Sequence, residues 1–457
     1  MVVFTKKFFE IYIKRVFLCV DFIAFLCHIQ GCKKGKVFIN MSKHKLRVLS
    51  LFSGCGGMDL GLEGGFEIPS VCYNKKFHPD WNPIKTKKGY LKLKKTRFDT
   101  VFANDIRNDA KSAWFRYFKK QDKDIYNVKS IVDLVKAVKK GEWKFPDNID
   151  VVTGGFPCQD FSVAGKRKGF CSDKSHNGDK TVVCVDPSES RGSLYLWMKD
   201  VISIVQPKLF IAENVKGLTN LADAKKIIER DFAATCDDGY LVVDAKVLYA
   251  PDYGVPQSRE RVIFLGFKKS ALTKNALKEL SKDIINDLYD PYPIKTHGDL
   301  QQKNLLPTVT SGDVLANLPE PENSNDVDQQ TYSKAKYMGK HCQGQSEIRL
   351  NRVGPTIRSE HHGNIEFRRL NAEHGGIYNN ELRDGKKERR LTIRECARLQ
   401  TFPDDYHFVY KKNDNFSGVS GSQAYQLIGN AVPPYLAYNL AKRLEENWDL
   451  YFKKEDE

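Results

Sequence analysis

Short apolar runs that alternate with amphipathic stretches are the feature that most constrains the fold of this chain. The first run, residues 47–52, is followed by the glycine turn 53–57 and a helical pattern from Met58 onward. The alternation continues with strand candidates at 101–103, 149–152, 209–212, 241–248 and 262–267 and helix candidates at 110–119, 194–205 and 222–232. It predicts an α/β fold with a doubly wound, Rossmann-like sheet that is mostly parallel and covered by helices on both faces.

The regular alternation fades after residue 267, which indicates a domain change. Proline, asparagine, glutamine and aspartate accumulate around residues 318–330, and helical patterns return at 391–399 and 434–447. We therefore expect a large first domain over 46–267, a second, smaller domain over 268–349, and a C-terminal part over 350–457.

The N-terminal residues differ in composition from the rest of the chain. Their apolar stretch, 16–27, is interrupted by Asp21 and is followed by several lysines. At 12 residues it is too short to span a bilayer, and no small-residue cleavage pattern follows it. We expect a dispensable or disordered leader over 1–45, a functional chain that begins near Met41, and no membrane association.

The charge and the cysteine content of the chain limit its possible binding partners and its cellular compartment. Lys and Arg number 73 against 57 Asp and Glu, a formal net charge of +16. Such an excess favours a polyanion such as nucleic acid, although it is also typical of lysine-rich soluble surfaces. The 11 cysteines contain no CxxC pair, so neither a disulfide framework nor a zinc site is indicated and no metal is expected. These features favour a reducing, cytoplasmic location.

One cysteine lies where an α/β enzyme presents a nucleophile. Cys158 follows the apolar run 149–152, within the glycine-flanked segment GGFPCQDFS at 154–162. A free thiol has a pKa of about 8.5, so a catalytic cysteine needs partners from other segments to form the thiolate near neutrality. By itself, a buried cysteine is more often a small hydrophobic residue than a catalyst.

Six segments taken together carry a family resemblance. They are FSGCGG at 52–57, PCQ at 157–159, ENV at 213–215, QSRER at 257–261, RLTIRE at 390–395 and GNAVP at 429–433. In this order they resemble the signature blocks of DNA (cytosine-5) methyltransferases of the prokaryotic restriction-modification type. The resemblance implies an S-adenosylmethionine-dependent catalytic domain at 46–267, a target-recognition domain at 268–349, and a part at 350–457 that returns to and completes the catalytic domain.

The resemblance also implies the reaction. A methyl group passes from S-adenosylmethionine to C5 of a cytosine that is flipped out of a short, specific sequence in double-stranded DNA. Cys158 is implied as the nucleophile that bonds to C6, and Glu213 as the acid that protonates N3, with a pKa raised by burial. Arg261, with Arg259, is implied to hold the base edge. Taken singly, Glu213 also fits a helix cap and the arginines also fit a surface pair with Glu260.

The implied donor is positive at its sulfur and carries no phosphate, so pyrophosphate binding does not explain the glycine turn. We expect the turn to let the backbone approach the donor, with Asp105 on the ribose hydroxyls and Asn430 closing the pocket. The expected donor-binding residues are Phe52, Ser53, Gly54, Gly56, Gly57, Asp105, Pro157 and Asn430. The family's third, acidic contact has no clear match within 127–134, which offers Ser130, Ile131 and Asp133.

Two insertions and a basic stretch lie outside the six blocks. Residues 72–97 carry nine Lys or Arg, which fits a solvated excursion or an additional DNA-contacting loop. Residues 170–190 follow the cysteine block, in the stretch that closes over the substrate in the family. Phosphate contacts are expected from His361, His362, Arg368 and Arg369.

The implied partners are double-stranded DNA, S-adenosylmethionine and a cognate restriction endonuclease that acts on the same site, and a monomer is expected. One alternative is a transfer RNA cytosine-5 methyltransferase of the same fold, which the long module after Phe267 disfavours. Another is a non-catalytic DNA-binding regulator, which the presence of Cys158 and Glu213 disfavours. The recognition sequence is not readable from the chain.

Overall fold

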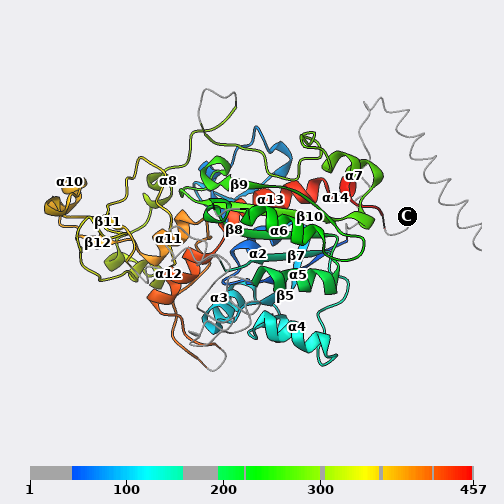
Figure 1. The fold of residues 1–457 in the computed structure, drawn as a ribbon. Helices are drawn as coiled ribbons and strands as arrows, with labels where there is room; N and C mark the ends of the chain where they lie inside the picture. Colours follow the sequence, from blue (N-terminus) through cyan, green and yellow to red (C-terminus); the bar gives the residue numbers. More distant parts are fainter. Residues whose placement is uncertain are drawn as a thin grey trace, which may run out of the picture. The chain divides into compact units, whose positions relative to one another are not determined.

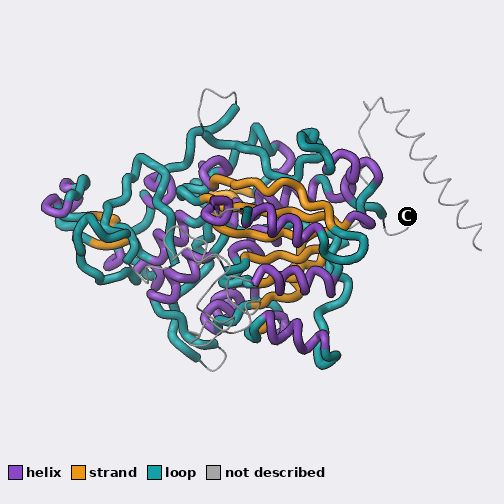
Figure 2. The backbone as a smooth tube through the Cα atoms, viewed as in Figure 1, coloured by secondary structure: helices purple, strands orange, loops and turns teal. Residues whose placement is uncertain are grey.

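A seven-stranded β-sheet organises the chain (Figure 2). The computed structural model describes residues 44–157, 194–220, 223–298, 304–359, 364–413 and 416–454. The leader residues up to 43 and the cysteine turn from Cys158 to residue 193 lie outside this part. In spatial order the strands are β6 (Tyr126–Asn127), β5 (Phe98–Asn104), β1 (Leu46–Leu51), β7 (Val151–Gly155), β8 (Leu209–Val215), β10 (Glu260–Lys268) and β9 (Tyr240–Tyr249).

The sheet is mostly parallel, as predicted. Strands β6, β5, β1, β7 and β8 pair in parallel, whereas β10 is antiparallel to both of its neighbours. The chain order changes direction beside β1, because β5 lies on one side of it and β7 on the other. In open α/β sheets, ligands bind outside the carboxyl ends of the strands at such a switch point.

Helices cover both faces of the sheet, because successive side chains of a strand point to opposite sides. Val48 and Ile211 belong to one apolar core with α2 (Gly57–Glu63) and α13 (Pro434–Glu446). Their neighbours Leu49 and Ala212 belong to a second core with α4 (Ile131–Lys139), α5 (Leu194–Val205) and α6 (Ala224–Ala233) (Figure 1). The expected doubly wound architecture is therefore confirmed.

Helix α13, near the C-terminus, packs closely against α2, the first helix of the described residues. Gly61 of α2 permits this approach, since a side chain there would collide with Ala437 and with the Pro434 carbonyl. A further helix, α3 (Asn108–Phe118), lies beside the glycine turn and buries Trp114. Elements from both ends of residues 45–457 thus build one side of the sheet.

The remaining elements are short. The helices and strands that follow β10 in the sequence, apart from α13, are α7 (Lys274–Leu280), α8 (Ser311–Leu315), α9 (Val327–Gln330), β11 (Phe367–Arg369), α10 (Asn379–Arg383), β12 (Arg389–Arg390), α11 (Ile393–Leu399), α12 (Gly421–Asn430) and α14 (Trp448–Tyr451). Ala276 and Leu280 of α7 are buried in the same core as α13. Residues 45–457 form one compact unit, and the domain boundaries at 267 and 349 stay a prediction.

The basic insertion at 72–97 is an ordered part of the protein and not merely a solvated excursion. It contributes β3 (Ile84–Lys85) and β4 (Tyr90–Lys92) to a small antiparallel sheet, in which β4 pairs with β3 on one side and with β2 (Glu67–Pro69) on the other. Trp81 is buried, stacks on His78 and donates a hydrogen bond from its indole nitrogen to Glu446 at 2.8 Å. Apolar and aromatic side chains therefore anchor the insertion.

Neither membrane-spanning helices nor disulfide bonds occur in the described ranges. No helix there has the length and hydrophobicity needed to cross a bilayer. The described cysteines, which are Cys55, Cys72, Cys236, Cys342 and Cys396, are all free thiols.

Candidate active site

A cavity of about 530 Å³ opens at the carboxyl ends of β1, β5, β7 and β8, within the size range of small-molecule sites. Most of the residues predicted from the sequence line it. They are Phe52, Ser53, Gly54, Gly57, Asp105, Pro157, Glu213, Arg259, Arg261 and Asn430. Segments more than 350 residues apart in the sequence thus meet at the edge of the sheet where the topology predicts a ligand site.

The glycine turn forms one wall of the cavity. Phe52 adopts φ +53° and Gly54 φ +54°, and a left-handed conformation at a non-glycine residue is typical of functional turns. The amide of Gly54 donates to Asp105 Oδ2 at 3.1 Å, while Asp105 Oδ1 accepts from the Arg107 amide at 3.0 Å. Burial raises the pKa of Asp105, and the Arg107 amide and charge oppose this effect. A side chain at Gly54 would meet no protein atom within 4 Å, so a ligand has room there.

Gly56 and Gly57 are small for packing reasons. A Cβ at Gly56 would lie 2.6 Å from Trp114 Cδ1, and among the described residues Gly56 is not part of the cavity lining, which differs from the prediction. Gly57 does line the cavity, but its missing side chain makes room for the Val432 carbonyl. Both glycines therefore let α3 and the C-terminal block approach the turn.

Glu213 and Arg261 form a buried ion pair on another wall. Arg261 Nε lies 2.6 Å from Glu213 Oε1, and Glu213 is 7% exposed. The two side chains come from adjacent antiparallel strands, β8 and β10. Burial raises the pKa of Glu213, while Arg261 and then Arg259 oppose the increase. A carboxyl group in this environment retains its proton to a higher pH than an exposed one.

The strand that leads into the cysteine turn is aligned with Glu213. Gly155 pairs with Glu213 in the β7–β8 register, and a Cβ at Gly155 would lie 2.9 Å from Glu213 Oε2. The Asn214 side chain donates to the Phe156 carbonyl at 3.2 Å. The backbone is thereby held two residues before Cys158, which itself lies outside the described residues together with the insertion at 170–190.

Arg259 holds backbone segments together. Its guanidinium donates to the carbonyls of Ile357, Gly429 and Ala431 at 3.1, 2.7 and 2.8 Å. All three acceptor residues also line the cavity. Arg259 is thus a bridge between the QSRER and GNAVP blocks, a contact that differs from the predicted one with the base edge.

Other residues that join the QSRER and GNAVP blocks were not singled out in the sequence. Gln257 donates to the Gln400 side chain at 2.5 Å and accepts from the Ile357 amide at 3.2 Å. Gln400 in turn donates to the Ala431 carbonyl at 2.6 Å. The only signal for Gln257 was its place in the QSRER block, whereas nothing in the sequence pairs it with Gln400.

The stretch 127–134, in which the sequence showed no clear third donor contact, also reaches the cavity. Ser130 and Ile131 line the cavity, whereas Asp133 does not.

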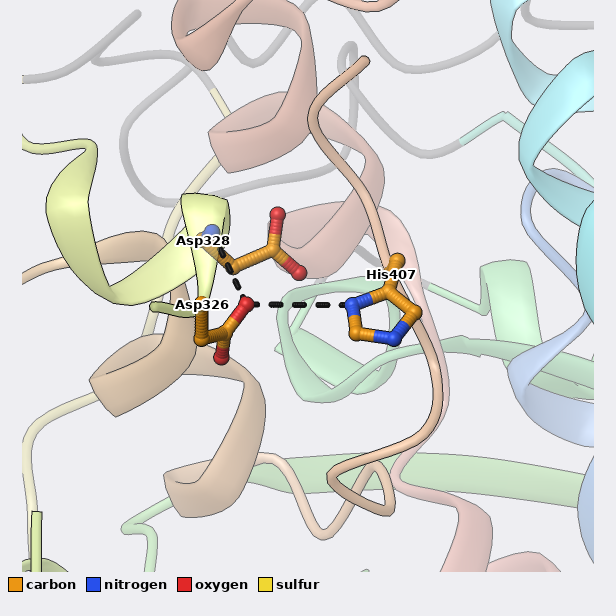
Figure 3. Close-up of side chains that lie close together, drawn as sticks. All are labelled: Asp326, Asp328 and His407. Carbon is orange, nitrogen blue, oxygen red and sulfur yellow. Dashed lines mark hydrogen bonds and ion pairs between the residues drawn. The ribbon is translucent and has the colours of Figure 1, made fainter. Parts of the chain in front are cut away.

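The RLTIRE block performs a structural task. Arg394, which is 1% exposed, forms ion pairs with Asp326 at 2.6 Å and Asp328 at 3.0 Å. His407 joins this cluster at 3.7 Å from Asp326 (Figure 3). Asp and His are metal-ligand types, but here the Arg394 guanidinium supplies the positive charge. Through these ion pairs the block links α11, which carries Arg394, with α9, which carries Asp328 and begins after Asp326.

The phosphate contact predicted for Arg369 is wrong. Its side chain is fully buried and pairs with Glu320 and Glu381 at 2.5 and 2.7 Å. Arg368 also pairs with Glu381, at 3.1 Å. His361 and His362 lie outside the described residues.

Comparison with known proteins places this geometry in a family context. The profile described as C-5 cytosine-specific DNA methylase matches residues 87–446. The type II methyltransferase M.BsuRI of Bacillus subtilis is 30% identical over 91% of this chain and 82% of its own length. The type II methyltransferase M.NgoFVII of Neisseria gonorrhoeae is 28% identical over 89% of this chain and 88% of its own length. The solved structure of the Entamoeba histolytica methyltransferase EhMeth has a similar fold, with a TM-score of 0.52 at 15% identity over 89% of this chain and 100% of that one.

Proposed function

Because this chain belongs to the C-5 cytosine-specific DNA methylases and transfers a methyl group from S-adenosylmethionine to C5 of cytosine in DNA, we propose that it is the modification enzyme of a restriction-modification system. The relatives named type II methyltransferases support this proposal. In that role it protects host DNA from an endonuclease that acts on the same site. We further propose that it works as a monomer in the cytoplasm, where DNA and the methyl donor meet.

The observation that carries the catalytic proposal is the convergence of Glu213, Arg261 and the strand end before Cys158 on one cavity. In the proposed reaction the Cys158 thiolate bonds to C6 of the flipped cytosine. Glu213 gives its proton to N3, so that electron density flows to C5. After methyl transfer the C5 proton passes to a water molecule, and the electron pair of that C–H bond expels the sulfur from C6 as the thiolate. N3 then returns its proton to the Glu213 carboxylate, which restores the aromatic ring and both side chains.

The wall of the cavity that is formed by the glycine turn fits S-adenosylmethionine. The open space at Gly54 and the acceptor Asp105 beside it suit a donor that carries a ribose and an amino-acid group. We propose that Phe52, Ser53, Gly54, Gly57, Asp105, Pro157 and Asn430 contact it, and that Gly56 acts through packing alone. When bound, the donor supplies an electrophilic methyl group on a positive sulfur. Arg259 is proposed as a positioning residue that holds the C-terminal wall of this pocket.

Target recognition is proposed to rest on residues 268–349. This segment supplies Gln343 to the cavity lining, where it accepts a hydrogen bond from Arg358 at 2.9 Å. It is tied to the C-terminal part through Asp326, Asp328 and Arg394. A module that reaches the mouth of the cavity is suited to reading the bases around the flipped cytosine.

Covalent catalysis is tested with Cys158→Ser. We expect methyl transfer to fall below detection while donor binding stays within about threefold, because the hydroxyl is a far weaker nucleophile than the thiolate. The assay is transfer of labelled methyl groups to duplex DNA or transfer RNA, after bisulfite sequencing of DNA from expressing cells has identified the site. Cys236→Ser, outside the cavity lining, is the matched control and should keep full activity. Substantial turnover by Cys158→Ser would exclude the covalent mechanism, and labelling of transfer RNA alone would exclude the modification role.

A further inference from the structure

A buried carboxylate lies directly beneath the glycine turn. Asp59 of α2 is 0% exposed. It accepts hydrogen bonds from the Ser50 hydroxyl at 2.6 Å and from the Trp114 indole at 2.8 Å. Among the described residues it forms no ion pair with a lysine or arginine. Burying a carboxylate without a neighbouring cation is unfavourable, so a compensating positive charge is expected from another source.

The hydrogen bonds around Asp59 connect it to the cavity. The Asn104 amide donates to Ser53 Oγ at 3.2 Å, and Ser50 Oγ donates to Asp59 Oδ1 at 2.6 Å. Ser53 Oγ lies 2.9 Å from Ser50 Oγ and 3.0 Å from the Ser50 carbonyl, and its single proton is donated to one of these two acceptors. Ser50 and Ser53 both line the cavity. Both groups that contact the Asp59 carboxylate, the Ser50 hydroxyl and the Trp114 indole nitrogen, donate to it, and the indole nitrogen can only donate. Such a network favours an ionised carboxylate at its end.

The cation whose charge acts on Asp59, Lys120, is already engaged with other acids. Lys120 pairs with Glu63 at 2.9 Å and with Asp99 at 2.8 Å. Arg107, whose charge acts on Cys55 and Asp105, pairs with Asp109 at 2.5 Å. The other titratable groups that interact with Asp59 are Glu63, Cys55, Tyr126 and Tyr406, and none of them carries a positive charge. The described residues therefore leave the charge of Asp59 largely uncompensated.

We propose that Asp59 is the counter-charge for the positive sulfur of S-adenosylmethionine, which makes the site prefer the methyl donor over its product, S-adenosylhomocysteine. The proposal rests on the donor site proposed above. Both ligands carry the same amino-acid and nucleoside groups, but only the donor has a charged sulfur. The negative charge of Asp59, behind the cavity wall, attracts the positive sulfur through the protein interior, which screens charges less than water does. Once the methyl group has left, this attraction disappears and the product is released more easily.

The test is the binding of both ligands to the full-length enzyme and to Asp59→Asn, measured by calorimetry at pH 8. We expect the variant to bind S-adenosylmethionine about tenfold more weakly and S-adenosylhomocysteine within about twofold of wild type. The control is Asp150→Asn, a buried aspartate at the amino end of the central strand β7 and outside the cavity lining, and it should leave the ratio of the two affinities unchanged. Equal weakening of both ligands, or no change in either, would overturn the role of Asp59. Failure of the wild type to bind either ligand would instead overturn the donor site.

A second variant keeps the carboxylate and shifts its titration. Burial raises the pKa of Asp59 to about 6, and the hydrogen bonds from Ser50 and Trp114 oppose this. The preference for the donor should therefore be present above pH 6 and fade below it. Ser50→Ala removes a stabilising hydrogen bond and should move the midpoint of this change to higher pH. Comparing wild type with Asp59→Asn at each pH distinguishes the titration of Asp59 from that of Asp105 and Glu213, whose pKa values are also raised. An unmoved midpoint would contradict the proposal even if Asp59→Asn did not fold.

Discussion

At the scale of single residues, the active-site chemistry depends on how burial acts on ionisable groups. Glu213 lies 2.6 Å from the Arg261 guanidinium, a contact that favours the carboxylate. Removal of Glu213 from water favours the neutral acid and is the larger effect, so the pKa of Glu213 is raised. The proposed proton donor is thus held by an arginine without being permanently ionised by it.

We expect Glu213→Gln to reduce the rate of methyl transfer by about a hundredfold, the usual contribution of a positioned acid. Single-turnover transfer to the identified DNA site measures it, and donor affinity serves as the folding control. In the wild type the rate should fall as pH rises through the pKa of Glu213, because the acid loses its proton. This limb of the pH profile should be absent in the variant. A full rate with the amide would remove Glu213 from the mechanism.

At the scale of elements, the cavity is built by connections between segments that are far apart in the chain. The QSRER block precedes and enters β10, and its side chains reach the segment near Ile357 and the end of α12. Thr356 adds a hydrogen bond from its hydroxyl to the Ser258 carbonyl. The donor pocket therefore depends on whether these connections hold its C-terminal wall in place.

Arg259→Lys tests this view of the junction. A lysine ammonium cannot reproduce the fork of a guanidinium that reaches three carbonyls. We expect the KM for S-adenosylmethionine to rise about tenfold while kcat falls by less than about threefold, because the change loosens the pocket wall and leaves the reacting groups in place. Steady-state kinetics at saturating DNA provide both values, and the exposed Arg230→Lys should alter neither. A loss confined to kcat would instead indicate direct contact of Arg259 with the base.

At the scale of the whole molecule, ion pairs in the interior fasten α9 to α11. Arg394 and Asp328 are each 1% exposed, and Asp328 also accepts hydrogen bonds from the amides of Phe408 and Val409 at 2.9 and 2.7 Å. Burial acts to raise the pKa of Asp326, but hydrogen bonds from His407 and Arg394 outweigh it and lower the pKa below the usual range. Its contribution to stability is therefore present above the unfolded pKa and is lost as pH falls through the folded one.

We expect Arg394→Met to lower the free energy of unfolding by about 3–5 kcal/mol, because it leaves buried carboxylates without their cation. Urea denaturation at neutral pH measures the change. The double variant Arg394→Met/Asp328→Asn should recover part of the loss. Lys144→Met, which breaks an exposed pair with Asp147, should cost less than about 1 kcal/mol. A similar small effect for Arg394→Met would show that the cluster does not stabilise the fold.

The sequence by itself determined six of the seven strands of the sheet, their alternation with helices and the identity of the six blocks, because strand and helix periodicity and turn glycines are local properties. The short strand β6, the spatial order of the strands and the antiparallel direction of β10 came from the structure. Only the tertiary structure decided what the residues in those blocks do. It placed Gly56 against Trp114, directed Arg259 onto backbone carbonyls and buried Arg369 and Arg394 in ion pairs. It also left Asp59 beneath the glycine turn without a cation in the described structure. Such partners come from positions distant in the chain, and burial and charge depend on how those positions meet in space, which no local pattern records.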